Sequence, residues 1–287
     1  ATAEDGQDVA PHYLPDGRIV FSSTRQRQSK ASLLDEGKPQ FEAQDENDDE
    51  PAFVLHVMNA DGSGLHQVSF NQSHDLDPAV LNDGRIVFSR WDRAPGHDEI
   101  SLYAMRPDGT GLELLYGAHS HATGTDDSEV HFFDPRAMAD GRLLVRVQPF
   151  EAPELGGQLL TIDIANYVED AQPTLPNRGV LTGPAQVPAT SNDVRTIDGP
   201  SPGGRYLAGF PLRDGTGRLL LTWTQCRLLE NTQIVPCTPD RLAATTVALA
   251  PPLYGVWIYD PASSTQLPVT SPVEGTVYSE VVALQSL

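Results

Sequence analysis

The sequence predicts an all-β protein of the β-propeller class, and three observations support this prediction. An Asp-Gly-Arg turn followed by an apolar run occurs at 16–21, 83–88 and 140–145, with a looser copy at 214–221. Each copy is followed by two further strand-like stretches in the same order. No stretch carries a sustained apolar stripe at helical spacing, so little helix is expected. A tight turn leading into a buried strand, repeated along one chain, is typical of a radial array of four-stranded blades.

The strands of each unit follow from these turns. A strand is expected before the first two turns, at 9–14 and 77–81, and the alternation of apolar and polar residues at 100–105 and 256–260 indicates half-buried strands. Turns rich in Gly, Asp and Asn, at 59–64 and 106–111, separate the third and fourth strands. The remaining strands are expected at 53–58, 65–69, 112–116, 158–164, 179–182, 254–261 and 265–270.

The four repeats predict a single propeller domain over 1–287. Its four recognisable four-stranded blades are expected at roughly 9–72, 73–131, 132–190 and 191–275. Residues 276–287 include Tyr278–Leu284, which resembles an opening strand. This segment is expected either to begin a fifth blade, as part of a larger propeller, or to close the ring. The Asp-Gly turns lie 57 to 74 residues apart, whereas a bare blade needs only about 40–50. Insertions are therefore expected at 26–50, 119–131, 170–177, 182–191 and 227–252.

The composition limits the classes of partner that the protein can bind. The formal net charge is −20, which argues against binding of nucleic acid and against docking on an anionic membrane surface. No run approaches the roughly 20 apolar residues of a membrane-spanning helix. The acidity fits a soluble secreted protein, or a surface for a cation or a basic partner.

The two cysteines, Cys226 and Cys237, flank a strand-like stretch. A hairpin closed by a disulfide fits this spacing and would place the protein in an oxidising compartment, periplasmic or extracellular. Two unpaired thiols in a cytosolic protein, or a two-thiolate metal site, are the alternatives.

Two groups of residues are candidate metal ligands. His119, His121 and His131 lie in one loop rich in carboxylates, and such a set could bind Zn²⁺, Cu²⁺ or a haem iron. A polar loop with hydrogen-bonded histidines, or a proton-transfer role, is the alternative. Asp75 and Asp77, between the first two units, could bind Ca²⁺ through oxygen ligands or could instead cap turns.

Motifs of covalent catalysis are missing. Gly199–Gly203 fits G-x-S-x-G formally, but the prolines on both sides of Ser201 favour a turn. The chain has no C-x-x-C-H motif and therefore no covalent haem site of its own. No catalytic residue is assigned, and no cofactor is certain.

The blade motifs carry a resemblance to a known family. The stretches 14–25 and 57–64 resemble the repeat of TolB-type propellers and, more specifically, the propeller region of the hydrazine synthase alpha subunit and its relatives; 102–111, 116–124 and 251–261 extend the match. The resemblance implies a periplasmic complex with protein partners, among them a multihaem cytochrome.

Two functions follow as expectations. The first is a non-catalytic periplasmic or secreted propeller that acts as a scaffold or protein-binding subunit of a larger assembly. The second is the propeller part of a haem- or metal-dependent redox enzyme or electron-transfer complex that resembles hydrazine synthase.

Overall fold

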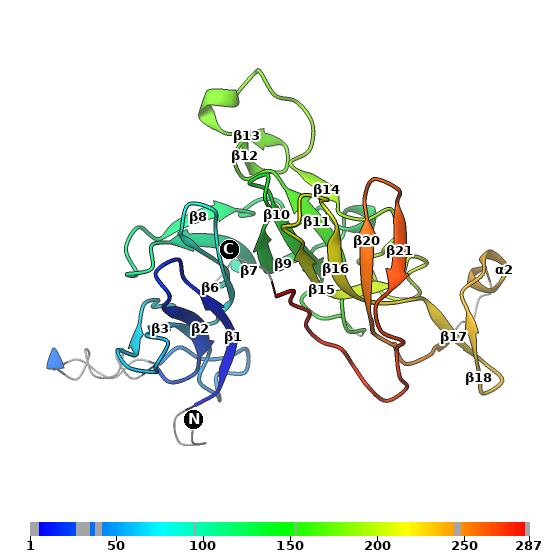
Figure 1. Cartoon of the computed structure of the whole chain (residues 1–287), viewed down its shortest axis with the longest axis horizontal. Coiled ribbons are helices and arrows are strands. Elements are labelled where there is room, and N and C mark those ends of the chain that lie inside the picture. The colour runs from blue at the N-terminus through cyan, green and yellow to red at the C-terminus, as the bar shows by residue number, and fades with distance from the viewer. Residues whose placement is uncertain are drawn as a thin grey trace.

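The computed structural model describes residues 6–26, 35–37, 42–94, 96–152, 154–243 and 248–284. Its strands form four four-stranded antiparallel sheets, which follow one another as the blades of an arc (Figure 1). The predicted β-propeller class is thereby confirmed. Part of the predicted insertion at 26–50 lies outside the described residues.

The four sheets are numbered as blades 1 to 4. Blade 1 contains β1 (Asp8–Tyr13), β2 (Ile19–Ser23), β3 (Val54–Met58) and β4 (His66–Gln67). Blade 2 contains β5 (Asp75–Val80), β6 (Ile86–Ala94), β7 (His97–Met105) and β8 (Glu113–Tyr116). Blade 3 contains β9 (His131–Ala137), β10 (Leu143–Gln148), β11 (Gln158–Ile162) and β14 (Gln186–Pro188). Blade 4 contains β15 (Arg205–Pro211), β16 (Leu219–Thr224), β20 (Gly255–Asp260) and β21 (Thr265–Pro268).

Two insertions carry structure of their own. Between β11 and β14, β12 (Tyr167–Glu169) pairs with β13 (Gln172–Pro173), and a 3-10 helix spans Leu175–Asn177. Between β16 and β20, β17 (Arg227–Glu230) pairs with β18 (Gln233–Pro236) and β19 (Ala248–Leu249), and α2 spans Pro239–Leu242. The hairpin β17–β18 and the loop after β13 project away from the blades (Figure 1), whereas Tyr167 of β12 is buried in the cluster shared by blades 2 and 3. A further 3-10 helix spans Thr125–Asp127.

The repeated Asp-Gly-Arg turn has a direct physical cause. In the first copy, the Asp16 carboxylate accepts the Arg18 amide at 3.1 Å and the Arg18 Nε at 2.8 Å. Gly17 between them has φ +84°, a conformation that disfavours residues with a Cβ. The copies at Asp83 and Asp140 make the same two bonds. Each turn thus fixes the register of the hairpin that it closes.

The core lies between the blades. Alternate residues of each second strand face opposite neighbours: Ile86 and Phe88 of β6 pack with blade 1, whereas Val87 packs in the cluster shared with blade 3. A third cluster joins blades 3 and 4 and contains Leu144 and Leu221. The first strands of successive blades, β1, β5, β9 and β15, also lie against one another and form the inner side of the arc.

Two expected strands are not present as predicted. Gly179–Thr182 does not form a strand, because the amides of Val180 and Leu181 both donate to the Asn177 carbonyl at the end of the preceding 3-10 helix. The fourth strand of blade 3 is β14 instead. Residues 276–284 form no strand with the described part of the chain. They run back from β21 toward the middle of the arc (Figure 1), and a fifth blade stays a prediction.

No helix among the described residues is long and apolar enough to cross a membrane.

Candidate functional site

The inner strands of the first three blades share a local distortion. Ala10, Asp77 and Asp134 have φ of 51°, 50° and 52°, and each is followed by a proline. The ladder with the neighbouring strand shifts register at each of these points, which marks a β-bulge. Positive φ is unfavourable for a residue with a Cβ, and bulges re-aim side chains near functional sites. The distortions therefore define the inner side of the arc as the first candidate site.

Four side chains there form what we call the axial network: His12, Asp77, Asp134 and Arg136. The Arg136 guanidinium donates to His12 Nε2 at 2.7 Å and lies 2.7 Å from Asp134 Oδ1. The Asp134 amide donates to Asp77 Oδ2 at 3.1 Å. Since His12 Nε2 accepts a hydrogen bond, the ring is neutral with its proton on Nδ1, which lies 3.4 Å from the Ala10 carbonyl.

Burial controls the protonation of this network. The pKa of Asp134 is raised to about 7: burial is the largest cause, Asp77 and Glu280 also raise it, and Arg136 and Arg146 oppose the shift. Burial lowers the pKa of His12 to about 4, with the charge of Arg136 as the second cause. The network can therefore hold a proton on Asp134 near neutral pH, but its histidine stays an uncharged acceptor.

The predicted histidine site is only partly assembled. The rings of His121 and His131 lie 5.1 Å apart, both buried, whereas His119 is exposed and its amide donates to Glu169. The Nδ1 atoms are engaged with the blades: that of His121 lies 2.6 Å from the Val130 carbonyl, and that of His131 accepts the Ile100 amide at 3.1 Å. The three histidines therefore do not form one ligand set. Among the described residues no group of three or more His, Cys, Asp or Glu side chains is arranged to hold a metal ion, so metal binding stays a prediction.

His131 belongs to a repeated motif that the sequence analysis missed. His74 and His131 each open a His-x-x-Asp-Pro stretch, nine residues before the Asp-Gly-Arg turn of their unit. His74 Nδ1 accepts the Phe53 amide at 3.0 Å, in the position where His131 accepts the Ile100 amide. Each ring thus joins the start of one blade to the third strand of the blade before, within β7 at Ile100 and directly before β3 at Phe53. The signal was available in the sequence as a second repeat with the same period.

The predicted calcium ligands have different partners. Asp75 is fully buried, and its carboxylate lies 3.7 Å from Arg90 and 3.4 Å from the Asn71 amide group. Burial raises its pKa to about 6. Asp77 belongs to the axial network instead. Calcium binding by the two together stays a prediction, and the cation nearest to Asp75 is a guanidinium.

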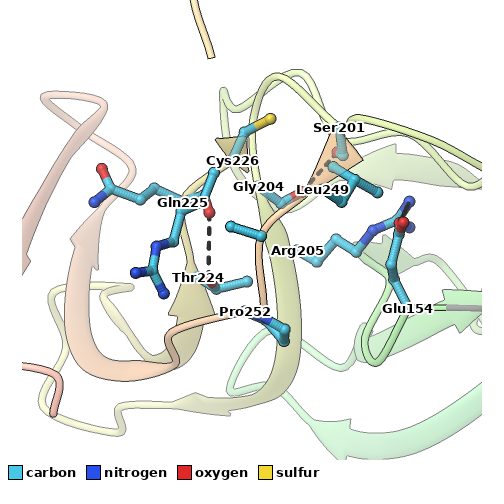
Figure 2. Close-up of a pocket in the computed structure, with 11 residues that line it drawn as sticks. Glu154, Ser201, Gly204, Arg205, Thr224, Gln225, Cys226, Leu249 and Pro252 are labelled. Carbon is cyan, nitrogen blue, oxygen red and sulfur yellow. Dashed lines mark hydrogen bonds and ion pairs between the residues drawn. The ribbon is translucent and has the colours of Figure 1, made fainter. Parts of the chain in front are cut away.

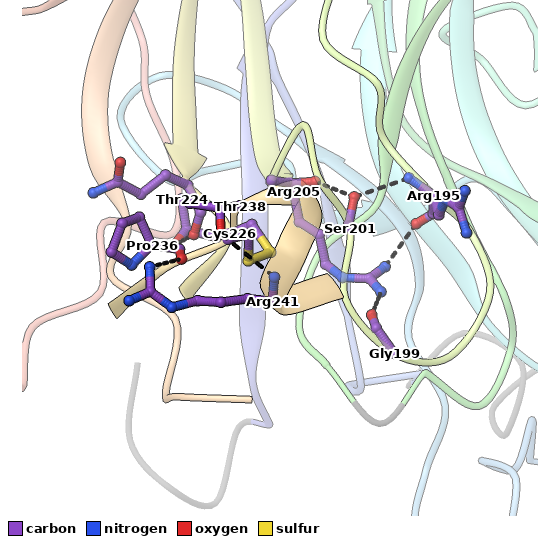
Figure 3. The surroundings of a disulfide bond; sticks show 12 residues. Arg195, Gly199, Ser201, Arg205, Thr224, Cys226, Pro236, Thr238 and Arg241 are labelled. Carbon is purple, nitrogen blue, oxygen red and sulfur yellow. Dashed lines mark hydrogen bonds between the residues drawn. A yellow bond between two sulfur atoms is a disulfide. The ribbon is translucent and has the colours of Figure 1, made fainter. Parts of the chain in front are cut away.

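The predicted disulfide between Cys226 and Cys237 is present, with the two Cα atoms 5.5 Å apart (Figure 3). It closes the base of the hairpin β17–β18. Thr238 caps α2, since its hydroxyl accepts the Arg241 amide at 3.4 Å, and Arg241 also pairs with Glu230 at 2.8 Å. We call residues 226–243 the arm.

A small cavity of about 40 Å³ lies where the arm joins blade 4 (Figure 2). Arg205 borders it, pairs with Glu154 at 2.8 Å and donates to the carbonyls of Arg195 and Gly199. The Ser201 hydroxyl donates to the Gly204 carbonyl at 2.6 Å, so the G-x-S-x-G stretch is a turn, as predicted. The cavity has room for water.

Comparison with known proteins supports the fold. No family model matches the chain, and no curated protein matches it. Among solved structures, hydrazine synthase of Kuenenia stuttgartiensis matches with a TM-score of 0.56 and 15% identity over 93% of this chain and 33% of that one. TolB from Acinetobacter baumannii matches with a TM-score of 0.49 and 12% identity over 92% of this chain and 44% of that one.

The chain therefore spans less than half the length of these two structures. At such identities the likeness shows the fold alone. The resemblance predicted from the blade motifs is confirmed at that level, and the class of protein is the β-propeller.

Proposed function

We propose that the chain is a non-catalytic propeller of the periplasm or the extracellular space, and that its arm binds a protein partner. The observation that carries the proposal is the arm itself: a disulfide-clipped hairpin that stands off from blade 4 (Figure 1). Rigid elements that project from a propeller present side chains to partners without disturbing the blades.

The arm has the composition of a small interface. Leu229 and Ile234 are directly opposite in the β17–β18 ladder, so their side chains share one face of the hairpin. They are 42% and 48% exposed, whereas the neighbouring Leu228 is buried. The Arg241–Glu230 ion pair adds charged groups beside this apolar pair. Apolar centres with polar rims are typical of protein interfaces.

Two further observations support the proposal. The disulfide is the kind of bond that persists in oxidising compartments, which favours a periplasmic or extracellular location. Four histidines are engaged in hydrogen bonds within and between blades: His12, His74, His121 and His131. These side chains therefore serve the framework. The partner class that the resemblance implies is a multihaem cytochrome.

The test is affinity capture from an envelope fraction of the source cells with wild-type chain, the double variant Leu229→Glu/Ile234→Glu, and Leu175→Glu as a control. Leu175 is 78% exposed on the other insertion. We expect one partner to be retained by the wild type and the control and lost by the double variant. Equal retention by all three would contradict the role of the arm.

The same preparations address the redox alternative. A Soret band in the captured partner alone supports a cytochrome as that partner. A Soret band or stoichiometric metal in the purified chain would instead favour a haem- or metal-dependent redox component.

A further inference from the structure

The two ends of blades 2 and 3 carry different charge. In an antiparallel blade, the turns after the first and third strands lie at one end, and the connections after the second and fourth strands lie at the other. At the first end, each Asp-Gly turn of these blades carries its own arginine, so the turns are neutral. At the second end, ten carboxylate residues and only two arginines occupy 92–99, 117–130, 149–157 and 189–204. We call this second end of blades 2 and 3 the acidic end.

An exposed aromatic ring lies at the acidic end. Phe150 is 40% exposed, and two buried rings support it: that of Trp91 at 5.0 Å and that of His131 at 4.9 Å between ring centroids. Trp91 belongs to blade 2 and His131 to blade 3, so Phe150 lies where these two blades meet. Blades 1 and 4 flank this pair, and the surface is therefore built from the middle of the arc.

Three carboxylates beside these rings have no Lys or Arg partner within the described residues: Asp98, Glu99 and Glu129. The first accepts Trp91 Nε1 at 2.6 Å. The second lies 3.5 Å from Nε2 of His121, whose ring is 5.1 Å from that of His131. The third lies 3.6 Å from His131 Nε2. Since His131 is neutral when Nδ1 accepts an amide, it leaves the charge of the third carboxylate uncompensated.

The same chain shows which group fits such surroundings. The Arg93 guanidinium lies 5.4 Å from the Trp91 ring centroid and pairs with Asp48 at 2.5 Å. An arginine thus stacks on an aromatic ring while a carboxylate holds its charge. Phe150 has carboxylates around it in the same way, but within the described residues no guanidinium lies on its ring.

We propose that the acidic end binds a basic segment of a protein, with an arginine of that segment stacked on Phe150 and paired with the neighbouring carboxylates. Arginine suits this role because its planar guanidinium stacks on rings and binds carboxylates at the same time. The carboxylates spread over four connections, which is wider than one small cation covers and favours a segment with several basic side chains. This surface is separate from the apolar pair of the arm, Leu229 and Ile234.

The probe is a fluorescein-labelled octa-arginine peptide, and octa-citrulline, which has a similar shape without the charge, is the control peptide. Fluorescence polarisation measures the Kd at about 150 mM salt, where the Debye length is about 8 Å and long-range attraction is screened. Glu99→Gln/Glu129→Gln removes two charges from the acidic end. Glu113→Gln/Asp240→Asn removes two exposed charges elsewhere and is the matched control. Phe150→Leu keeps an apolar side chain but removes the ring, and circular dichroism checks that each variant is folded.

The wild type is expected to bind octa-arginine and not octa-citrulline. Glu99→Gln/Glu129→Gln should weaken binding about fivefold to tenfold, and Phe150→Leu about twofold to fivefold. The matched control should change the Kd by less than about twofold, because long-range charge is screened. No binding of octa-arginine by the wild type, equal weakening by the two double variants, or an unchanged Kd in Phe150→Leu would each overturn the proposal.

Discussion

The opening strands of blades 2 and 3 follow one sequence pattern but bury different chemistry. Both begin with His-x-x-Asp-Pro, and in both the histidine accepts an amide from the blade before. The next residue is Asp75 in blade 2 and Phe132 in blade 3, and both are completely buried. Asp75 lies beside Arg90, whereas Phe132 packs edge-on against Tyr116 with ring centroids 5.6 Å apart. The same position thus accepts a charge or a ring, because Asp75 has its partner on the next strand of its own blade and Phe132 has its partner on the blade before.

The largest effects on the free energy of unfolding are expected from substitutions that break each of these two contacts. Phe132→Ala removes a buried ring and should lower the free energy of unfolding by about 3–5 kcal/mol. Arg90→Met leaves the Asp75 carboxylate buried without its cation and should cost about 3–5 kcal/mol as well. Urea unfolding followed by tryptophan fluorescence measures both.

The double variant Asp75→Leu/Arg90→Met sharpens the comparison. It replaces the ion pair with apolar side chains, as blade 3 does, and should recover most of the stability that Arg90→Met loses. A double variant as unstable as the single one would mean that Asp75 does more than balance Arg90.

The second-largest effect is the loss of stability of the fold in acid. Burial, together with the charge of His121, lowers the pKa of His131 from 6.5 to about 4. Between those two pH values the unfolded chain binds a proton that the folded chain does not, so stability falls as the pH falls from 7 to 4. His131 alone should account for about 3 kcal/mol of that loss. His131→Gln removes this titration.

The measurement is the difference in unfolding free energy between wild type and His131→Gln at several pH values. That difference should shrink toward pH 4. A constant difference across the range would show that the His131 pKa is not depressed.

A smaller effect on stability is expected from loss of the hydrogen bond that each histidine accepts from a backbone amide. His74→Ala leaves the Phe53 amide without its acceptor and should cost about 1–3 kcal/mol. His119→Ala is the matched control, because that ring is exposed, and should change stability by less than about 0.5 kcal/mol. Equal effects of the two substitutions would contradict the framework role of His74.

The smallest effect concerns the bulge that the inner strands share. Ala10 has φ 51°, which costs a residue with a Cβ roughly 1 kcal/mol. Asn adopts this conformation more readily, as Asp does at Asp77 and Asp134. Ala10→Asn should therefore raise the thermal midpoint by a few degrees at most. A clear loss of stability would show that Ala10 has no room for a side chain.

Much of the fold was predictable from the sequence because local turn chemistry repeats. The Asp-Gly-Arg turns each carry their own hydrogen bonds and mark their hairpins without help from distant residues. A strand was predicted at Gly179–Thr182, but the segment forms a turn. A short apolar run next to Gly and Pro fits either conformation, and only the presence of a neighbouring strand decides between them. The axial network was not predicted, since His12 and Arg136 come from different blades and meet only when the blades pack. Cys226 and Cys237 were predictable because their pairing is local.

The most direct test of the account is a pH titration of the histidine ring nitrogens by NMR on isotopically labelled chain, with and without added Zn²⁺. His74 and His131 accept backbone amides through Nδ1, which requires neutral rings. Both rings should carry their proton on Nε2 at pH 7, His131 should titrate near pH 4, and Zn²⁺ should leave both signals unchanged. Titration of His131 near 6.5, or loss of both ring signals on addition of Zn²⁺, would contradict this assignment.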